Sequence, residues 1–334
     1  MSTAALPVAP FEAPLWIRGA HAQTIGGRLL RKTGGVHFRK ERLDTPDGDF
    51  LTLEYATVDE HPLPETAPLV LKLHGLEGSA HSGYSVELAR SLARRGVRSV
   101  GLNFRSCGGE MNRSARFYHS GEVEDLDLVL DHLLRTTPAD RLGALGFSLG
   151  GNVLLKYLGE LGSAGSSRLK TAVAISVPYD LAVCADQMSN GAARVYAAFF
   201  LRSLRQKIRA KEALLNGHCD VPRALKARVV REFDDALTAP LHGFAGAEDY
   251  YRRSSSGQFL GGIAIPALLV HSMDDPIAVA GSIPHDTIAA NTSLKTAFTE
   301  HGGHVGFVMG PGPWAPVFWA EEKGAEFLAG ILTA

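Results

Sequence analysis

Ser148 lies between two glycines in the stretch "GFSLG", residues 146–150, which has the pattern G-x-S-x-G. A serine hydroxyl becomes a strong nucleophile only when a neighbouring base takes its proton, and it then attacks carbonyl carbons. The pattern alone is weak in a chain that contains 36 glycines. It predicts a nucleophile when a strand precedes the serine and a helix follows it, because that tight turn exposes the hydroxyl. An acid and a histidine must then follow in the chain.

Two acids follow the serine in the apolar stretch "ALLVHSMDDPIAV". Asp274 and Asp275 come directly after a predicted buried strand, and α/β sheets build their sites at the carboxyl ends of such strands. Asp275 is favoured because it stands just before a turn, and Asp274 is then a turn or cap residue. The acid would hold the imidazole in one tautomer and stabilise its protonated form.

Two histidines end the next predicted strand, in "TEHGGHVGF". His304 is favoured as the general base, because the glycine pair before it lets the chain turn back over the sheet edge. His301 is then a structural histidine. A metal site is the alternative for the pair, but no H-E-x-x-H pattern or cysteine pair accompanies them. We therefore predict no metal and no organic cofactor.

Attack on a carbonyl creates a negative oxygen, which backbone N–H groups stabilise in an oxyanion hole. One donor is predicted to be the amide of Leu149, the residue after the nucleophile. The other is predicted to be the amide of Leu76 in the loop "LHGLEGS", where His74 and Gly75 turn the chain. These two residues are candidates for the pocket wall, or else form a plain strand-to-loop turn.

The segments around these residues alternate between short apolar stretches and longer amphipathic ones. Buried strands are predicted at "PLVLKLHG", "VRSVGLNF", "RLGALGF" and "LKTAVAISV", with helices such as "YSVELARSLARRG" and "NVLLKYLGELG" between them. An antiparallel hairpin is predicted before them, from "HFRKERLDT" through the turn "PDGD" to "FLTLEYA". This order predicts an α/β protein with a mostly parallel sheet and helices on both of its faces.

A helical segment interrupts this alternation from about residue 180 to residue 262. We predict a single domain over residues 1–334, with residues 180–262 inserted as a helical cap. Tyr196, Phe199 and Phe200 recur there at helical spacing, which favours a packed helix face, with the wall of an acyl-chain pocket as the alternative. The basic stretch "LRQKIRAKEALL" is interpreted as a solvated helix face, or else as a contact with a membrane surface.

A polar loop at residues 104–122, "FRSCGGEMNRSARFYHSGE", follows a predicted strand on the side of the site. Two interpretations apply to Arg105, Glu110, Arg113 and His119. They form a hydrogen-bonded network that holds the loop, or they line the pocket and bind a substrate headgroup. Cys107 lies in the same loop, and beside a complete serine set we assign it no nucleophilic role.

The composition is that of an ordinary globular protein, with 45% hydrophobic residues and a net charge of −1. The charge balance argues against nucleic acid as a partner. Three widely spaced cysteines argue against a disulfide framework and favour a reducing compartment. The first twenty residues lack the apolar region of a signal peptide, and no stretch reaches the roughly 18 apolar residues of a membrane span. We expect a cytoplasmic protein, with peripheral membrane contact left open.

Several motifs spread over almost the whole chain point to one family: "HGLEGS", "NFRSCGGEMNR", "FYHSGEVEDL", "GFSLGGN", "REFDDALTAPLHGF", "DYYRRSS", "HSMDDP" and "HGGHVGF". Together they resemble the YheT-like branch of the α/β-hydrolases. The resemblance implies an eight-stranded α/β-hydrolase fold with a helical cap, and a charge relay that maps onto Ser148, Asp275 and His304. Related eukaryotic members are associated with lipid esters, which implies a lipophilic substrate.

These observations predict a serine hydrolase of small-molecule carboxylic esters that works through an acyl-enzyme. A thioesterase or another acyl hydrolase would share the same intermediate. The rival from a different class is a non-catalytic member that uses the fold to bind a ligand or a protein. It would require a lost member of the serine, acid and histidine set or a filled pocket, and none of the three residues is missing.

Overall fold

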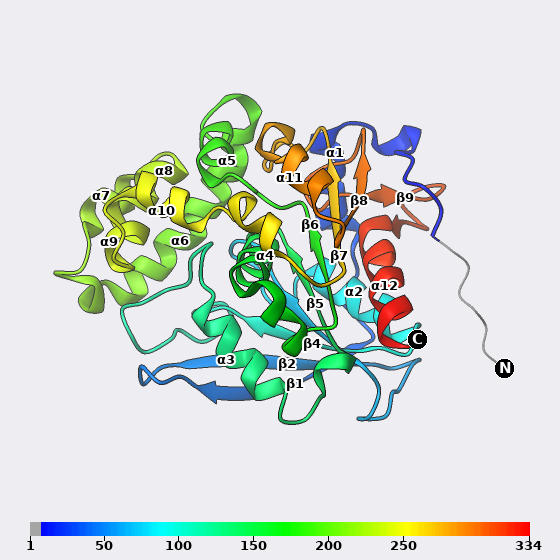
Figure 1. The fold of residues 1–334 in the computed structure, drawn as a ribbon. Coiled ribbons are helices and arrows are strands. Elements are labelled where there is room, and N and C mark those ends of the chain that lie inside the picture. Colours follow the sequence, from blue (N-terminus) through cyan, green and yellow to red (C-terminus); the bar gives the residue numbers. More distant parts are fainter. Residues whose placement is uncertain (1–7) are drawn as a thin grey trace.

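A computed structural model describes residues 8–334, and its centre is an eight-stranded sheet (Figure 1). The strands are β1 (Val36–Asp44), β2 (Phe50–Val58), β3 (Leu69–Leu73), β4 (Arg98–Asn103), β5 (Leu142–Phe147), β6 (Thr171–Ile175), β7 (Ala267–Ser272) and β8 (Leu294–Thr299). They are ordered β1-β2-β4-β3-β5-β6-β7-β8. The predicted hairpin β1–β2 is antiparallel, as is β2–β4, and all other pairs are parallel. The predicted sheet is confirmed.

Helices connect the strands and cover both faces of the sheet (Figure 1). Those outside the β6–β7 connection are α1 (Ala20–Leu30), α2 (Gly83–Ala93), α3 (Glu124–Leu133), α4 (Leu149–Leu161), α11 (His285–Ala290) and α12 (Trp319–Leu332). The β6–β7 connection contains α5 (Leu181–Gln187), α6 (Arg194–Leu215), α7 (Val221–Lys226), α8 (Val230–Phe233), α9 (Ala239–Leu241) and α10 (Ala247–Ser254).

The core divides into two layers because successive residues of a strand point to opposite faces. In β3, Leu71 packs in the cluster that contains Val153 of α4, whereas Val70 packs in the cluster that contains Leu328 of α12. All four side chains are buried. Each such apolar side chain contributes about 1.5–3 kcal/mol to folding, so the two layers hold the central strands firmly in register.

Helices α6 to α10 gather on the left of Figure 1, away from α12. Phe117 of the 104–122 loop packs in a buried cluster with Leu201 of α6 and Phe233 of α8. These helices therefore rest on the 104–122 loop. A short π-helix, Asp234–Thr238, joins α8 to α9. No helix within residues 8–334 combines the length and the apolarity needed to cross a bilayer.

Two N- and C-terminal elements were not predicted. Helix α1 follows a 3₁₀ turn, Leu15–Ile17 (η1), and a short hairpin pairs β9 (Val308–Met309) with β10 (Val317–Phe318). The two lie together, because the side chain of Gln23 donates to the carbonyl of Val308 at 3.0 Å and accepts from its N–H at 2.7 Å. This contact places α1 against the segment that follows β8.

Candidate active site

Ser148 occupies the tight turn between β5 and α4 with φ 51° and ψ −118°. A non-glycine residue in this left-handed region is strained, and such strain concentrates at functional sites. The residues two positions before and after Ser148 must be glycine. A Cβ on Gly146 would lie 2.4 Å from the carbonyl oxygen of Gly150, and a Cβ on Gly150 would lie 2.5 Å from the carbonyl oxygen of Leu73. The G-x-S-x-G pattern therefore follows from close backbone approach.

The structure brings Ser148, His304 and Asp275 into one hydrogen-bonded chain. His304 Nε2 lies 2.8 Å from Ser148 Oγ, and His304 Nδ1 lies 2.9 Å from Asp275 Oδ2. With the imidazole neutral, the Nδ1–H donates to the carboxylate, and Nε2 accepts the proton of the serine hydroxyl. This arrangement can take a proton from Ser148 as its oxygen forms a new bond.

Asp275 is fixed independently of the histidine. Its Oδ1 accepts the backbone N–H of Ile277 at 2.8 Å and that of Ala278 at 2.9 Å. Burial alone would raise the pKa of Asp275, but the neighbouring His304 and these amides outweigh it and hold the pKa below its usual value. The carboxylate is thus ionised and oriented before any substrate binds.

The loop that carries His304 is held from behind by residues that the sequence did not single out. The N–H of His304 donates to Thr24 Oγ1 of α1 at 2.9 Å. The N–H of Val305, a residue with φ 53°, donates to Ser176 Oγ at 3.0 Å, and its carbonyl accepts from the Arg31 guanidinium at 2.6 Å. Thr24 lies in the stretch "WIRGAHAQT", residues 16–24, in which no local pattern indicates this role.

Leu76 and Leu149 both line the pocket beside Ser148. Within residues 8–334, neither backbone N–H donates a hydrogen bond to another group of the protein. The loop lies close to the serine, since a Cβ on Gly75 would be 3.2 Å from that of Ser148. Both amides are therefore available to a substrate oxygen.

Glu77, the residue after Leu76, ties this loop to α6. Its carboxylate is almost fully buried and accepts from Tyr118 OH at 2.8 Å, from Lys207 Nζ at 2.7 Å and from Ser203. The Tyr118 hydroxyl also accepts the N–H of Glu77 at 2.8 Å. The backbone at Glu77 has φ 55°, so these contacts hold the loop in a strained turn.

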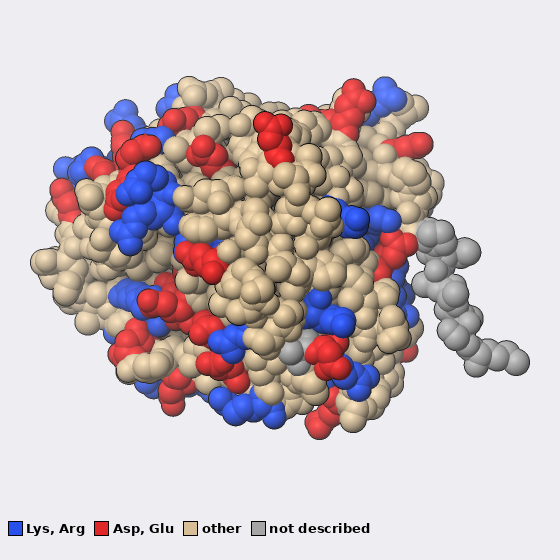
Figure 2. All heavy atoms as spheres, in the orientation of Figure 1, with Lys and Arg blue, Asp and Glu red and all other residues tan. Residues whose placement is uncertain are grey.

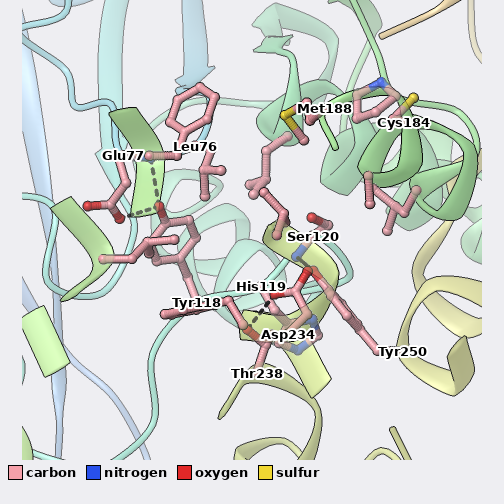
Figure 3. Close-up of a pocket in the computed structure, with 18 of the residues that line it drawn as sticks. Leu76, Glu77, Tyr118, His119, Ser120, Cys184, Met188, Asp234, Thr238 and Tyr250 are labelled. Carbon is pink, nitrogen blue, oxygen red and sulfur yellow. Dashed lines mark hydrogen bonds between the residues drawn. The ribbon is translucent and has the colours of Figure 1, made fainter. Parts of the chain in front are cut away.

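A cavity of about 110 Å³ lies between Ser148 and the helices of the β6–β7 connection. Its wall is mainly apolar, and Figure 3 shows Leu76 and Glu77 on one side with Met188 and Cys184 opposite. Asp234, Thr238 and Tyr250 make a polar end away from Glu77 (Figure 3). The apolar part is lined by Leu181, Met188, Phe200, Leu204, Ile208, Val230, Phe233, Leu237 and Ile277.

Of the residues predicted for the pocket, His119 and Phe200 line it. His74 and Gly75 do not. His74 is buried behind the loop, where its Nε2 accepts the N–H of Phe104 at 3.1 Å, and the N–H of Gly75 donates to Tyr84 OH at 3.0 Å. Burial lowers the pKa of His74 to about 4, so it is a neutral support for the loop.

Arg105 also lies outside the pocket, because three carboxylates hold it in the protein interior. Its guanidinium contacts Asp125 at 2.7 Å, Asp47 at 2.8 Å and Asp49 at 3.2 Å. Glu110 instead pairs with Arg42, and Arg113 is exposed near Asp44. For these three residues the structure follows the network interpretation of the 104–122 loop.

Tyr196 and Phe199 lie on the outer side of α6. The Tyr196 hydroxyl is 2.8 Å from His21 Nδ1 of α1, and Phe199 is 47% exposed. Within "LRQKIRAKEALL", Lys207 and Lys211 turn inward, since Lys207 pairs with Glu77 and Lys211 donates to Asn112 at 2.9 Å. The interpretation of this stretch as a solvated face therefore fails for these two lysines.

The alternative acid and histidine lie together at the surface. His301 Nδ1 is 3.5 Å from Asp274 Oδ2, and Asp274 accepts from the Ser272 hydroxyl.

Burial raises the pKa of the Cys107 thiol to about 11, so this thiol is protonated at neutral pH. Among residues 8–334, no three His, Cys, Asp or Glu side chains come together as a group that could hold a metal ion.

Residues 68–311 match the family model described as "alpha/beta hydrolase fold". The chain belongs to the α/β-hydrolase family. Among its relatives, "Putative esterase YheT" from Escherichia coli (strain K12) is 38% identical over 321 residues, which cover 94% of this chain and 91% of that protein. The match confirms that this α/β-hydrolase falls in the YheT-like branch.

Other relatives of this α/β-hydrolase are named as lipid hydrolases. Phospholipase ABHD3 from Homo sapiens is 28% identical over 90% of this chain and 74% of that protein, and monoacylglycerol lipase from Saccharomyces cerevisiae (strain ATCC 204508 / S288c) is 29% identical over 73% and 55%. The solved 2,6-dihydroxy-pseudo-oxynicotine hydrolase has a TM-score of 0.54 at 16% identity, covering 88% of this chain and 68% of that one. That similarity shows the fold alone.

Proposed function

We propose that this α/β-hydrolase is a serine hydrolase of carboxylic esters. The observation that carries the proposal is the chain of contacts from Ser148 Oγ through His304 to Asp275. Beside Ser148, the backbone N–H groups of Leu76 and Leu149 have no hydrogen-bond acceptor within residues 8–334. A nucleophile, a base, an orienting acid and an oxyanion site are the parts that acyl transfer through serine requires. No metal or organic cofactor is needed for this chemistry.

The reaction would proceed in two halves. Ser148 Oγ attacks the ester carbonyl while His304 Nε2 takes its proton, and the amides of Leu76 and Leu149 bind the negative oxygen. The protonated His304 then gives its proton to the leaving alcohol as the C–O bond breaks, which leaves an acyl group on Ser148. Water, deprotonated by His304, attacks this acyl-enzyme and releases the carboxylic acid. Asp275 stabilises the charged imidazole in both halves.

The cavity favours an ester with an apolar acyl chain. Its wall presents aliphatic and aromatic side chains from α5, α6 and α8, including Leu181, Phe200 and Phe233, and from Met188, which directly follows α5. Relatives named phospholipase and monoacylglycerol lipase support the same substrate class. We include in the proposal that residues 180–262 act as a cap that encloses the chain and excludes water.

Hydrolysis of p-nitrophenyl esters of increasing acyl length tests this function. We expect kcat/KM to rise roughly two- to fourfold for each methylene until the cavity is full, because each buried methylene contributes about 0.8 kcal/mol. Leu204→Trp, which narrows the cavity, should move the optimum to shorter chains. Ser148→Ala should lower kcat by about a thousandfold or more.

Ser120→Ala is the matched control, because Ser120 also lines the cavity. This variant should keep wild-type activity within about twofold, since no step uses its hydroxyl. Equal rates for Ser148→Ala and wild type would contradict the proposed nucleophile. A chain-length profile that Leu204→Trp leaves unchanged would contradict the proposed acyl site.

A further inference from the structure

Large apolar side chains stand exposed on the outer sides of η1, α1 and the start of α6. Leu15 and Leu29 are 76% exposed and Val195 is 68% exposed, and Ile25 and Phe199 are about half exposed. We call these five residues the α1–α6 face. Removing these side chains from water would be favourable, so a surface of this kind marks an interaction site.

The face is continuous across the two helices. The guanidinium of Arg28 lies 4.5 Å from the ring centre of Phe199, and the rings of His21 and Tyr196 are stacked with centres 5.7 Å apart. At i, i+4 and i+7 along α6, Val195, Phe199 and Arg202 are all exposed and share one side of the helix.

The β9–β10 hairpin extends the face on the other side of η1. The indole N–H of Trp16 donates to the carbonyl of Gly310 at 2.9 Å, which places the hairpin against η1. Trp314 and Val317 of this hairpin are also exposed. Within residues 8–334, seven of the ten exposed large apolar side chains lie on η1, α1, the start of α6 and the β9–β10 hairpin, so they are concentrated on these neighbouring elements.

The two chain segments that carry the α1–α6 face contain basic residues but no acidic ones. Residues 13–40 and 187–211 contain no aspartate or glutamate. Arg18, Arg28 and Arg202 are exposed there, as is Arg194, and within residues 8–334 none of these four arginines has a carboxylate within ion-pair distance. Over the side of the molecule that Figure 2 shows, blue and red groups stand side by side.

Exposed aliphatic and aromatic side chains flanked by unpaired arginines have the composition of an interfacial membrane-binding surface. We infer that the α1–α6 face docks on a bilayer that contains anionic phospholipids. The apolar side chains would enter the boundary between headgroups and acyl chains, and the four arginines would contact lipid phosphates and carboxylates. A second copy of this chain fits less well, because a two-fold contact would set arginine against arginine.

The position of the face gives the docking a consequence for substrate access. Phe199 points outward, whereas the next residue along α6, Phe200, lines the cavity. On the other helix, Thr24 of α1 holds the loop of His304. A bilayer on this face would therefore lie next to the acyl site, so that an apolar ester has only a short path out of the membrane.

Co-sedimentation with vesicles tests the docking, using full-length protein with Ser148→Ala so that no lipid is consumed. One set of vesicles is phosphatidylcholine with roughly 30% phosphatidylserine, and the other is pure phosphatidylcholine. We expect binding to the anionic set, at least about tenfold weaker binding to the neutral set, and weakening by added salt. Binding is read without catalysis, so this result is independent of whether the proposed hydrolase function holds.

Two pairs of variants locate the surface. Arg28→Glu with Arg202→Glu should weaken binding to anionic vesicles at least about tenfold, whereas Arg141→Glu, at an exposed arginine before β5, should leave it unchanged. Phe199→Glu should also weaken binding, whereas Leu214→Glu should not, although both side chains are 47% exposed on α6. Leu214 lies fifteen residues further along the helix, roughly 22 Å away.

Thermal unfolding of each variant within a few degrees of wild type would show that the fold is intact. The inference is overturned if wild type binds neither vesicle set, if it binds both equally, or if Arg28→Glu with Arg202→Glu binds as tightly as wild type. It is also overturned if light scattering shows a dimer that Phe199→Glu dissociates, because the face would then be covered by a second copy.

Discussion

At the scale of single residues, the proposed role of Asp275 is to fix the tautomer and charge of His304. Asp275→Asn should lower kcat by about 10⁴-fold with little change in KM, because an amide cannot stabilise the protonated imidazole. Steady-state kinetics with a p-nitrophenyl ester would measure this. Asp274→Asn is the matched control and should stay within about twofold of wild type, since Asp274 contacts Ser272 and the surface residue His301. Equal losses for both variants would contradict the assignment.

Asp234, at the polar end of the cavity, predicts a dependence of stability on pH. Burial raises its pKa to about 6, against the opposing hydrogen bonds from Thr238 and Tyr251. The folded state therefore holds this proton more tightly than the unfolded state, whose pKa is 3.8. The stabilisation is fully present below pH 3.8 and is lost as pH rises through about 6.

Asp234→Asn should remove this component, which is about 3 kcal/mol of unfolding free energy between roughly pH 4 and 7. Urea unfolding of both proteins across that range would measure it. Asp235→Asn, at a half-buried neighbour paired with Arg223, should keep the wild-type slope between roughly pH 4 and 7. Parallel curves for wild type and Asp234→Asn would show that the proton on Asp234 does not couple to folding.

Local sequence rules selected Ser148, Asp275 and His304, because each stands at the end of a recognisable strand. The residues behind them were not predictable in this way. Thr24 meets the His304 backbone across 280 positions of chain, and no local pattern reports such a contact. Arg105 was ambiguous for a related reason: its burial depends on three carboxylates from two distant segments.

At the scale of elements, α1 is expected to position the general base. Thr24→Val keeps the shape of the side chain but leaves the His304 N–H without its acceptor. We expect kcat to fall about tenfold with KM nearly unchanged, because small displacements of a catalytic group cost rate rather than binding. Thr24→Ser restores the hydroxyl and should recover most of the activity. Failure of the serine variant to differ from the valine variant would exclude a positioning role.

The elements that the sequence predicted have strong local signals. The β1–β2 hairpin has alternating residues around "PDGD", and β5 and α4 flank the serine with clear apolar patterns. Helix α1 has the opposite character. It contains the Gly26-Gly27 pair, which lowers helix propensity, and a Cβ on Gly27 would lie 3.1 Å from the backbone of Gly306. Contacts with distant parts of the chain, rather than local helix propensity, therefore stabilise α1.

At the scale of the whole molecule, the pair Glu77–Lys207 joins the loop that contains Leu76 to the helices of the β6–β7 connection. Lys207→Met should destabilise the protein by about 3 kcal/mol, because it leaves a buried carboxylate without its cation. Adding Glu77→Gln should recover more than half of that loss. Urea unfolding of the wild type, both single variants and the double variant would measure the coupling. Additive losses would mean that the two segments are not held together by this pair.

The central claim is that Ser148 is an activated nucleophile, and covalent labelling by a fluorophosphonate followed by peptide mapping tests it most directly. We expect one phosphonyl group per chain, on the peptide that contains Ser148, with labelling lost in Ser148→Ala and in His304→Ala. Ser120→Ala should label like wild type. Folded wild-type protein that stays unlabelled, or a label on any other residue, would contradict the account.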